Sequence, residues 1–275
     1  MIDLHCHSHY SDGLLSPKAL LERALQSGIK TLALTDHDTL EGVSELVREA
    51  QGKAIRIIPG IELSVRWKKY DLHILGLNVS VDSPDLVQLI DKQNLERINR
   101  GKAIGAALEG CGIDEAYQKA VALAGHERVG RAHYAQILLK ENYVQETKAA
   151  FKRYLGKGKV AYVPSSWIDL SEAVATIVAA GGKAVVAHPL KYKLTRTKLH
   201  ELMQDFKALG GEGIEVVSGA MLDQEMRQMS QLCHRFDLLA SSGSDFHGDG
   251  MSRVNLGHQK LLPSDCKPIW RAWHT

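Results

Sequence analysis

Side chains that could bind divalent metal ions begin close to the first residue of this 275-residue chain. The stretch IDLHCHSHYSDG, residues 2–13, places His5, His7 and His9 at alternating positions and follows them with Asp12. Aliphatic residues ordinarily fill the buried strands of an α/β domain, so three imidazoles in one strand need a chemical explanation. Imidazole nitrogen together with carboxylate oxygen suits Zn, Mn or Fe, whereas a purely oxygen ligand set suits Mg or Ca.

Residues of the same two types recur along the chain in short motifs. The motifs are TDHD, GIELS, DLHILG, AHP and SDFH, and the candidate ligands in them are His37, Glu62, His73, His188, Asp245 and His247. Any one of these motifs alone is more often a coincidence than a ligand site. Their shared position is informative, because each accompanies a short aliphatic run of the kind that forms a strand.

Seven such runs alternate with amphipathic helical segments, a rhythm typical of parallel strands joined by crossover helices. The predicted strands are IDLH, TLALTD (31–36), the stretch 55–65, DLHILGL (71–77), AVVAHP (184–189), GIEVVSG (213–219) and LLASSGSD (238–245). The carboxyl ends of parallel strands meet at one rim, where α/β proteins assemble their sites. We therefore expect His5, His7, Asp12 and the six motif residues to converge there. Nine ligands are too many for one ion but suit two or three, with Glu62 as a bridging carboxylate.

Helix signals fall between the predicted strands. Ser16 is a predicted N-cap with Pro17 at the first helical position, and Gly28 follows where a left-handed residue belongs. Further helices are predicted within 40–52, 196–211 and 222–236. From about residue 83 to 159 only helical patterns occur, which predicts an all-helical insertion with boundaries near 95 and 163.

The composition excludes several classes of protein. Formal net charge is only +2, from 34 basic against 32 acidic residues, so any nucleic acid must be bound locally. The longest apolar stretch, AVATIVAAGG, is about half of a membrane span, and no signal-peptide pattern opens the chain, so we expect no membrane contact. Cys6, Cys111, Cys233 and Cys266 lie far apart without a CxxC pair. This usage predicts free thiols and a cytoplasmic location.

The order of the motifs, HxHxxxxDG, TDHD, GIE, a strand histidine, AHP and SDFH, closely resembles the PHP family, named for polymerase and histidinol phosphatase. The resemblance covers nearly the whole chain apart from the insertion. It implies a distorted (β/α)7 barrel formed by residues 1–94 and 163–275, with the all-helical insertion of residues 95–162 covering the active site. This fold agrees with the seven strands read from the sequence.

The resemblance also implies how the nine ligands divide. His5, His7, Glu62 and Asp245 would hold one ion, Asp12, His37 and His247 a second, and Glu62, His73 and His188 a third. The cofactors implied are two or three divalent ions, above all Mn, with Zn or Fe as alternatives. His9 is not among the family's ligands and is expected to be a pocket or surface residue, while Cys6 points to the opposite strand face.

Hydrolysis of a phosphate ester is the chemistry that such ions favour. A metal-bridging hydroxide would be the nucleophile, because coordination lowers the pKa of water from about 16 towards 7. No side chain is then needed as a catalytic nucleophile. No GxSxG elbow, no GxxxxGK[ST] phosphate loop and no GxGxxG after a strand suggests a rival chemistry.

The insertion resembles that of the PHP branch that contains nucleoside 3′,5′-bisphosphate phosphatases and 5′-to-3′ exoribonucleases of the RNase AM kind. In that branch the segment matching VGRAHYAQ faces the metals, which makes Arg131 and His133 candidates for binding a substrate phosphate. Arg97, Arg100 and Arg253 are lesser candidates. A basic cluster is either an RNA-binding track or an ordinary solvated face: Lys148, Lys152, Arg153, Lys157 and Lys159.

The expected substrate is a nucleotide or short RNA with a 5′-phosphate, and no obligate protein partner is evident. Removing the 3′-phosphate of a nucleoside 3′,5′-bisphosphate and releasing the first nucleotide of a 5′-phosphorylated RNA both cut the ester at the 3′-oxygen. One pocket therefore fits both reactions. Two alternatives stay open, a histidinol-phosphate phosphatase and a non-catalytic metal-binding accessory PHP module of the kind attached to replicative polymerases.

Overall fold

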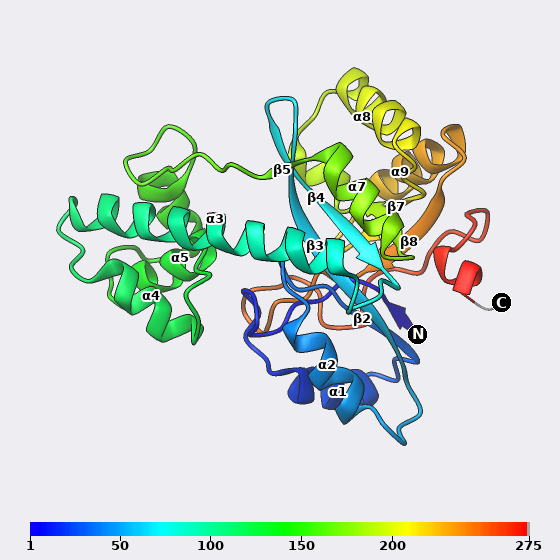
Figure 1. Ribbon diagram of the computed structural model, residues 1–275, viewed down its shortest axis with the longest axis horizontal. Helices are drawn as coiled ribbons and strands as arrows, with labels where there is room; N and C mark the ends of the chain where they lie inside the picture. Colours follow the sequence, from blue (N-terminus) through cyan, green and yellow to red (C-terminus); the bar gives the residue numbers. More distant parts are fainter. Residues whose placement is uncertain (274–275) are drawn as a thin grey trace.

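The computed structural model describes residues 1–273, and its centre is a mixed sheet (Figure 1). The strands are β1 (Ile2–Asp3), β2 (Thr31–Leu34), β3 (Arg56–Trp67), β4 (Tyr70–Leu77), β5 (Ile168–Asp169), β6 (Lys183–Val186), β7 (Gly213–Ser218) and β8 (Leu239–Gly243). Seven of them follow the order β1-β2-β3-β4-β6-β7-β8, and the short β5 pairs with β3 beside this path. The seven predicted strands are confirmed to within three residues at each end, whereas β5 was not predicted.

The two ends of the strand order meet, so the sheet nearly closes into a barrel. The backbone N–H of Leu4 donates to the carbonyl of Ser242 at 3.0 Å, and that of Asp245 donates to the carbonyl of His5 at 2.8 Å. The close approach requires Gly243, because a Cβ added there would lie 2.3 Å from the Cβ of His5. The predicted distorted (β/α)7 barrel is confirmed, and its closure places the first and last site-bearing segments side by side.

The prediction that all the strands are parallel is wrong for one strand, β4. β4 is antiparallel to both of its neighbours, β3 and β6, because Lys68 and Lys69 turn the chain directly back from β3. His73 is therefore the fourth residue of its strand instead of lying near the end of a parallel one. Reversal of the strand puts its beginning at the rim where the other strands end, so His73 still reaches the predicted place.

Helices cover the outside of the barrel. Five of them are α1 (Pro17–Gln26), α2 (Glu41–Glu49), α7 (Leu170–Ala179), α8 (Arg196–Ala208) and α9 (Asp223–Arg235). Figure 1 shows α1 and α2 together on one side and α7, α8 and α9 on the other. The predicted start of α1 is confirmed, since the Ser16 side chain accepts a hydrogen bond from Ala19 N at 3.2 Å. No helix within residues 1–273 has the length and apolar character needed to span a membrane.

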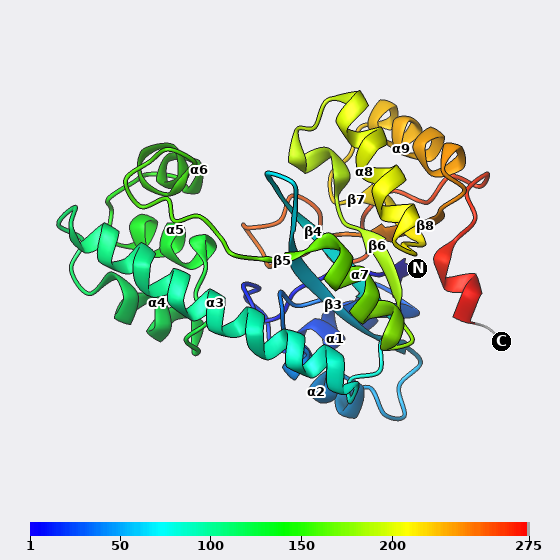
Figure 2. The same cartoon turned by 45° about the horizontal axis from the view of Figure 1, so that its top comes forward.

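The segment between β4 and β5 is helical throughout, as predicted, and projects from the barrel (Figure 2). It contains α3 (Pro84–Glu109), α4 (Ala116–Ala124), α5 (Arg131–Lys140), α6 (Thr147–Ala150) and a π-helical turn at Phe151–Leu155. α3 runs without a break across the predicted boundary at 95. Leu86, Leu89 and Ile90 join the barrel core, whereas Ile104 and Leu108 join the separate core of the helical segment.

The helical segment is also attached to the barrel by polar contacts near the rim. The guanidinium of Arg128 donates to both carboxylate oxygens of Glu41 in α2, at 2.7 and 2.9 Å. The same side chain contacts the carbonyl of Tyr10, and His126 Nε2 donates to the carbonyl of Ser11 at 3.1 Å. These contacts hold the beginning of α5 beside the loop that carries Asp12.

Closure of the barrel gives the first prediction. Gly243→Ala places a methyl group against the backbone and side chain of His5, so we expect the free energy of unfolding to fall by about 1–3 kcal/mol. Thermal unfolding followed by circular dichroism measures the change. Gly110→Ala is the control, because its added Cβ meets nothing closer than 3.4 Å. Equal melting temperatures for the two variants would contradict the proposed closure constraint.

Candidate metal centre

The structure brings all nine predicted ligands together at one rim of the barrel, and we call them the rim cluster. Its members are His5, His7, Asp12, His37, Glu62, His73, His188, Asp245 and His247. They come from β3, β4 and the segments that follow β1, β2, β6 and β8. Convergence from six places in the sheet produces several overlapping groups of three or four side chains that could hold a metal ion.

The most compact set contains His5, His7, Glu62 and Asp245. His5 Nε2 lies 3.1 Å from His7 Nε2, and each of these nitrogens lies 3.2–3.5 Å from Glu62 Oε2 and from Asp245 Oδ1. Ligand atoms placed tetrahedrally at about 2.1 Å from an ion are separated by about 3.4 Å. The two imidazole nitrogens therefore have the spacing of one coordination shell with each carboxylate oxygen in turn.

A second compact set shares Glu62. Its Oε1 lies 2.9 Å from His73 Nδ1 and 2.9 Å from His188 Nε2, and these two nitrogens are 3.3 Å apart. The two oxygens of Glu62 thus face different groups of imidazoles. This is the arrangement expected of a carboxylate that bridges two ions.

The third set is wider. Asp12 Oδ1 lies 3.4 Å from His247 Nε2 and 3.8 Å from His37 Nε2. His7 joins this group through Nδ1, which is 3.8 Å from the same oxygen. The opposite ring nitrogen of His37 lies 3.1 Å from Glu62 Oε2, so His37 stands between the two carboxylates.

Several buried polar atoms of the rim cluster lack a hydrogen-bond partner, which tests whether a cation fits. They are Asp12 Oδ1, Glu62 Oε2, His37 Nδ1 and His188 Nδ1. A buried carboxylate oxygen without a donor is costly unless a positive charge compensates it. The oxygens of Asp12 and Glu62 are surrounded by imidazole nitrogens, so a divalent ion supplies the missing interaction and the donor set fits it.

The pKa shifts within the rim cluster also indicate that positive charge is favoured there. Burial alone would raise the pKa of Asp12, Glu62 and Asp245, yet the surrounding histidines, joined at Asp245 by Lys191, hold all three pKa values well below the usual range. Burial alone would lower the pKa of His7, but Asp245 and Glu62 raise it to about 10. The carboxylates therefore stay ionised and draw cations or protons to the rim.

Glu215 is a functional residue that the sequence patterns did not reveal. This fully buried carboxylate of β7 accepts from His5 Nδ1 at 2.9 Å and from the backbone N–H of His188 at 2.6 Å. Its contact with Nδ1 directs the Nε2 of His5 towards the rim cluster, an orienting role common for carboxylates behind ligating histidines. The signal was present in GIEVVSG, where an acidic residue interrupts an otherwise apolar strand.

Two further buried carboxylates were not predicted, and both shape the loops of the site. Asp36 accepts from Ser8 N, Ser8 Oγ and Ser11 Oγ at 2.6–2.7 Å, which fixes the turn that ends β1. Asp38 accepts from Ser64 N at 2.8 Å and from Arg97 Nε at 2.6 Å. Arg97 is thereby held in place by an ion pair.

A small cavity beside the rim cluster contains most of the predicted phosphate-binding residues, and we call it the arginine cavity. It is lined by Asp12, His37 and His73 on one side and by Arg97, Arg100, Arg131 and His133 on the other. Burial and the neighbouring Arg131 and Arg97 lower the pKa of Arg100 to about 10. The guanidiniums of Arg97 and Arg100 also lie over the ring of Trp167. Like charges held this close form a strong site for an anion.

His133 adds a neutral donor to the arginine cavity. The backbone N–H of Gly130 donates to His133 Nδ1 at 3.0 Å, which places the ring proton on Nε2. Burial lowers the pKa of His133, so the ring stays neutral near pH 7. The side chain of Arg131, next to it at the start of α5, makes no hydrogen bond or ion pair with any residue among 1–273 and is available to a ligand.

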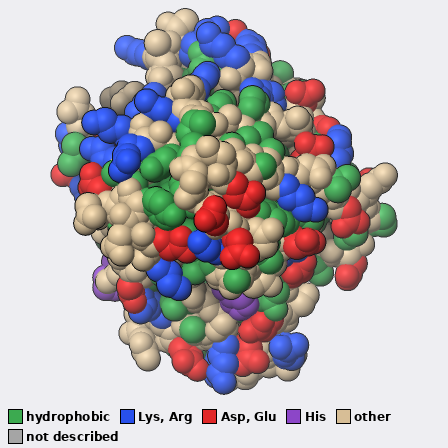
Figure 3. All heavy atoms as spheres, turned by 90° about the vertical axis from the view of Figure 1, so that its left-hand side faces the viewer, with side chains coloured by type: hydrophobic (Ala, Val, Ile, Leu, Met, Phe, Trp, Pro, Cys, Tyr) green, Lys and Arg blue, Asp and Glu red, His purple; other side chains and the backbone are tan. Residues whose placement is uncertain are grey.

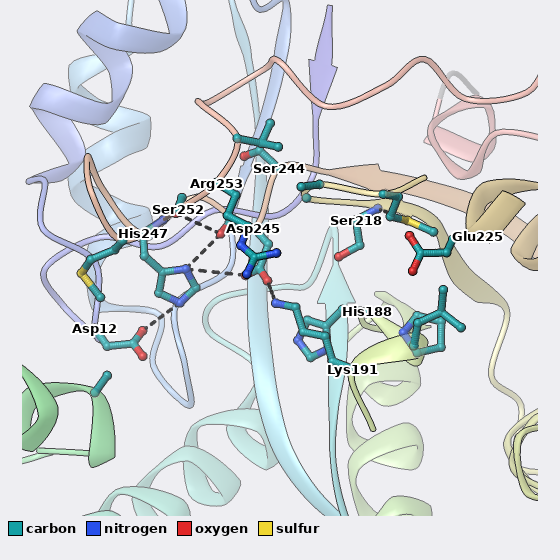
Figure 4. A pocket seen from close by; sticks show the side chains of 18 residues that line it. Asp12, His188, Lys191, Ser218, Glu225, Ser244, Asp245, His247, Ser252 and Arg253 are labelled. Carbon is teal, nitrogen blue, oxygen red and sulfur yellow. Dashed lines mark hydrogen bonds and ion pairs between the residues drawn. The ribbon is translucent and has the colours of Figure 1, made fainter. Parts of the chain in front are cut away.

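Arg253 is separated from the other four predicted phosphate-binding residues. It lines a second cavity, shown in Figure 4, which lies on the side of the rim cluster formed by His188, Asp245 and His247. Lys191, which was not among the predicted site residues, enters the same cavity and forms an ion pair with Asp245 Oδ2. We call this second space the Lys191 cavity.

The remaining candidates lie at the surface. His9 is exposed and stacks on Tyr10, and it belongs to none of the possible ligand groups within residues 1–273. The basic cluster of residues 148–159 is exposed as well. Figure 3 shows that the face of the molecule on this side carries acidic side chains among its basic ones. The four cysteines form no disulfide, and Cys6 is buried as predicted.

Comparisons with known proteins place this geometry in context. The family model described as the PHP domain matches residues 3–161. A protein named 5′-3′ exoribonuclease from Haemophilus influenzae is 42% identical, with 98% of this chain and 97% of that protein covered. A protein named 3′,5′-nucleoside bisphosphate phosphatase from Chromobacterium violaceum is 40% identical, with 98% and 95% covered.

Solved structures give the same picture of the fold. A structure from Chromobacterium violaceum, described as an amidohydrolase with bound sulfate and no metal, has a TM-score of 0.94 and 39% identity, with 98% of this chain and 95% of that chain covered. A structure from Bifidobacterium adolescentis, described as a metal-dependent phosphoesterase, has a TM-score of 0.85 and 25% identity, with 96% and 93% covered.

The contact between Glu215 and His5 gives the second prediction. Glu215→Gln weakens the orientation of His5, so we expect the affinity for divalent ions to fall by about 10–100-fold. Titration calorimetry with Mn²⁺ measures the change. Glu212→Gln is the matched control, since Glu212 pairs with Lys183 away from the rim. An unchanged affinity in Glu215→Gln would show that the hydrogen bond does not support metal binding.

Proposed function

Because this chain belongs to the PHP domain family, we propose that it is a metal-dependent phosphoesterase that hydrolyses the 3′-phosphoester of 5′-phosphorylated nucleotides. Its substrates are 5′-phosphorylated short RNA, degraded in the 5′-to-3′ direction, and nucleoside 3′,5′-bisphosphates. One observation carries the proposal. The arginine cavity is lined by rim-cluster residues and by Arg97, Arg100 and Arg131 together, so one ligand can contact both.

The rim cluster is the proposed metal site. His5, His7, Glu62 and Asp245 would hold one ion, Asp12, His37 and His247 a second, and Glu62, His73 and His188 a third. When bound, such ions lower the pKa of water towards neutrality and neutralise charge on phosphoryl oxygens. Two or three ions are consistent with the two faces of Glu62. We propose Mn first, with Zn or Fe as alternatives, because the mixed imidazole and carboxylate set suits all three metals.

The arginine cavity is the proposed site of the 5′-phosphate. Arg131 has no protein partner among the described residues, and its planar guanidinium can donate two parallel hydrogen bonds to phosphate oxygens. Arg100 adds a second positive charge, whereas Arg97 already pairs with Asp38 and chiefly fixes the wall. His133 Nε2 offers a neutral donor to the ester oxygens. Together these side chains position the 3′-phosphoester beside the rim cluster.

The helical segment is proposed to cover this site. Residues from it, including Arg131, His133 and Phe151, form one wall of the arginine cavity. Without that wall the rim cluster would face solvent and a phosphate would meet fewer fixed positive charges. We also propose a cytoplasmic location, supported by the four free cysteines.

Metal dependence is the third prediction. Removing divalent ions with a chelator should abolish hydrolysis of adenosine 3′,5′-bisphosphate and of 5′-phosphorylated RNA, because the rim cluster then lacks its source of positive charge. Adding back Mn²⁺ should restore both rates, and parallel additions of Zn²⁺ and Fe²⁺ rank the metals. Full activity in the chelator would exclude the proposed mechanism.

The role of Arg131 is the fourth prediction. Hydrogen bonds to charged groups contribute about 1.5–3 kcal/mol, so we expect Arg131→Ala to lower kcat/KM for 5′-phosphorylated substrates by about 10–100-fold. Hydrolysis of 5′-hydroxyl RNA, which we expect to be slow in the unaltered protein, should change little because this RNA has no 5′-phosphate to bind. Arg48→Ala is the control, since Arg48 is an exposed residue of α2.

Histidinol phosphate serves as the contrasting substrate in the same experiment. A histidinol-phosphate phosphatase would hydrolyse it faster than any nucleotide, and Arg131→Ala would leave the rates on small phosphomonoesters unchanged. An accessory module without catalysis would hydrolyse none of the substrates in Mn²⁺. Either result would replace the proposed function.

A further inference from the structure

The Lys191 cavity is too large to be a mere extension of the metal site. Its volume is about 540 Å³, against about 230 Å³ for the arginine cavity. Pockets for drug-sized ligands and cofactors have volumes of about 300–1,000 Å³. The Lys191 cavity therefore has room for a whole nucleotide.

The two cavities lie on different sides of the rim cluster and meet at its edge. His37 and His73 line the arginine cavity, whereas His188, Asp245 and His247 line the Lys191 cavity. Asp12 and Ala132 line both, so the two spaces adjoin there. A molecule held at the rim cluster can thus extend into both cavities at once.

The lining of the Lys191 cavity suits a nucleotide. Pro189, Leu190, Met221 and Met251 provide apolar walls, and methionine side chains adapt readily to flat aromatic groups. Ser218 provides a hydroxyl group facing the same space (Figure 4).

Two basic side chains that could bind a phosphate backbone line this cavity, Lys191 and Arg253. The Lys191 side chain is 58% exposed although its ammonium group pairs with Asp245. Arg253 is exposed and forms no ion pair or hydrogen bond with the other described residues. Figure 4 shows both side chains beside Asp245. Their charges favour a polyanion that passes out of the site on this side.

In the proposed function the 5′-phosphate of a nucleoside 3′,5′-bisphosphate lies in the arginine cavity and its 3′-phosphate at the rim cluster. Such a substrate has no nucleotide downstream of the 3′-phosphate. In RNA the same phosphate is a diester and carries a further nucleotide. That nucleotide has to leave the rim cluster by a route other than the one that holds the first nucleotide.

We propose that the Lys191 cavity binds the nucleotide immediately downstream of the scissile phosphate, with Arg253 contacting the next phosphate of the chain. This inference rests on the proposed function and makes single-stranded RNA diesters the substrate class for which the whole site is shaped. In the reaction a water oxygen bonds to phosphorus, the bond from phosphorus to the 3′-oxygen of the first nucleotide breaks, and a water proton goes to that 3′-oxygen. The downstream strand keeps the phosphate as its new 5′-end.

The test compares two substrates in Mn²⁺, a 5′-phosphorylated trinucleotide and a nucleoside 3′,5′-bisphosphate of the same first base. The measured quantity is the ratio of kcat/KM for the trinucleotide to kcat/KM for the bisphosphate. Arg253→Ala removes the phosphate contact, and Met251→Trp fills the cavity with a larger side chain. Both positions are exposed, and circular dichroism checks that the variants fold. Arg271→Ala, in the short helical turn Ile269–Trp273 outside both cavities, is the control.

We expect the ratio to fall by about ten-fold in Arg253→Ala and further in Met251→Trp, and to stay unchanged in Arg271→Ala. Unchanged ratios in both cavity variants, with both substrates still hydrolysed, would overturn the inference and leave the proposed function intact. Equal losses on both substrates would also overturn it, since the cavity would then hold the nucleotide that the substrates share. If the wild-type protein hydrolyses neither substrate, the proposed function fails and this inference falls with it.

Discussion

Burial of charge is the constraint on which this structure depends. The carboxylates of Asp12, Glu62, Glu215 and Asp245 lie in or behind the rim of a closed barrel, where each would be costly alone. Six imidazoles, supplied by five separate segments, face them. The imidazoles offset the cost of burying the carboxylates only when all of these segments are in register. The closure of the barrel and the assembly of the site therefore depend on the same strand register. When the imidazoles are neutral, the negative charge of these carboxylates attracts cations to the rim.

The site also distributes opposite charges in space. Negative groups are concentrated at the rim cluster, whereas Arg97, Arg100 and Arg131 stand in the adjoining wall. In the proposed function, metal ions and phosphates would therefore bind at separate, adjoining places instead of competing for the same side chains. Asp38 separates the arginines from the rim carboxylates, because its ion pair with Arg97 holds that guanidinium in the wall of the arginine cavity.

Much of this arrangement could be predicted from local sequence. The ends of aliphatic runs located the rim, and the spacing of HxH predicted that His5 and His7 point the same way, although both lie beyond the end of β1. The direction of β4 could not be predicted in this way, because DLHILGL is equally apolar in either direction and the two-residue turn at Lys68 and Lys69 lacks a glycine signal. Glu215 could not be located from the ends of strands, because it acts from within one. The Lys191 cavity is lined by residues from five segments that lie far apart in the sequence, so no local pattern predicts it.

The continuous helix α3 links the core of the barrel to the core of the helical segment, so insertions or deletions within it would alter how the two parts are placed. A helix of 26 residues is roughly 39 Å long, and every inserted residue shifts the C-terminal part of the helix by about 1.5 Å and turns it by about 100°. One insertion between Arg100 and Ile104 would swing α5, with Arg131, away from the rim. In the proposed function, Arg131 reaches the substrate phosphate only when α3 keeps its length and its helical phase. A change of length in the loops beyond α3 would leave the phase of that helix unaltered.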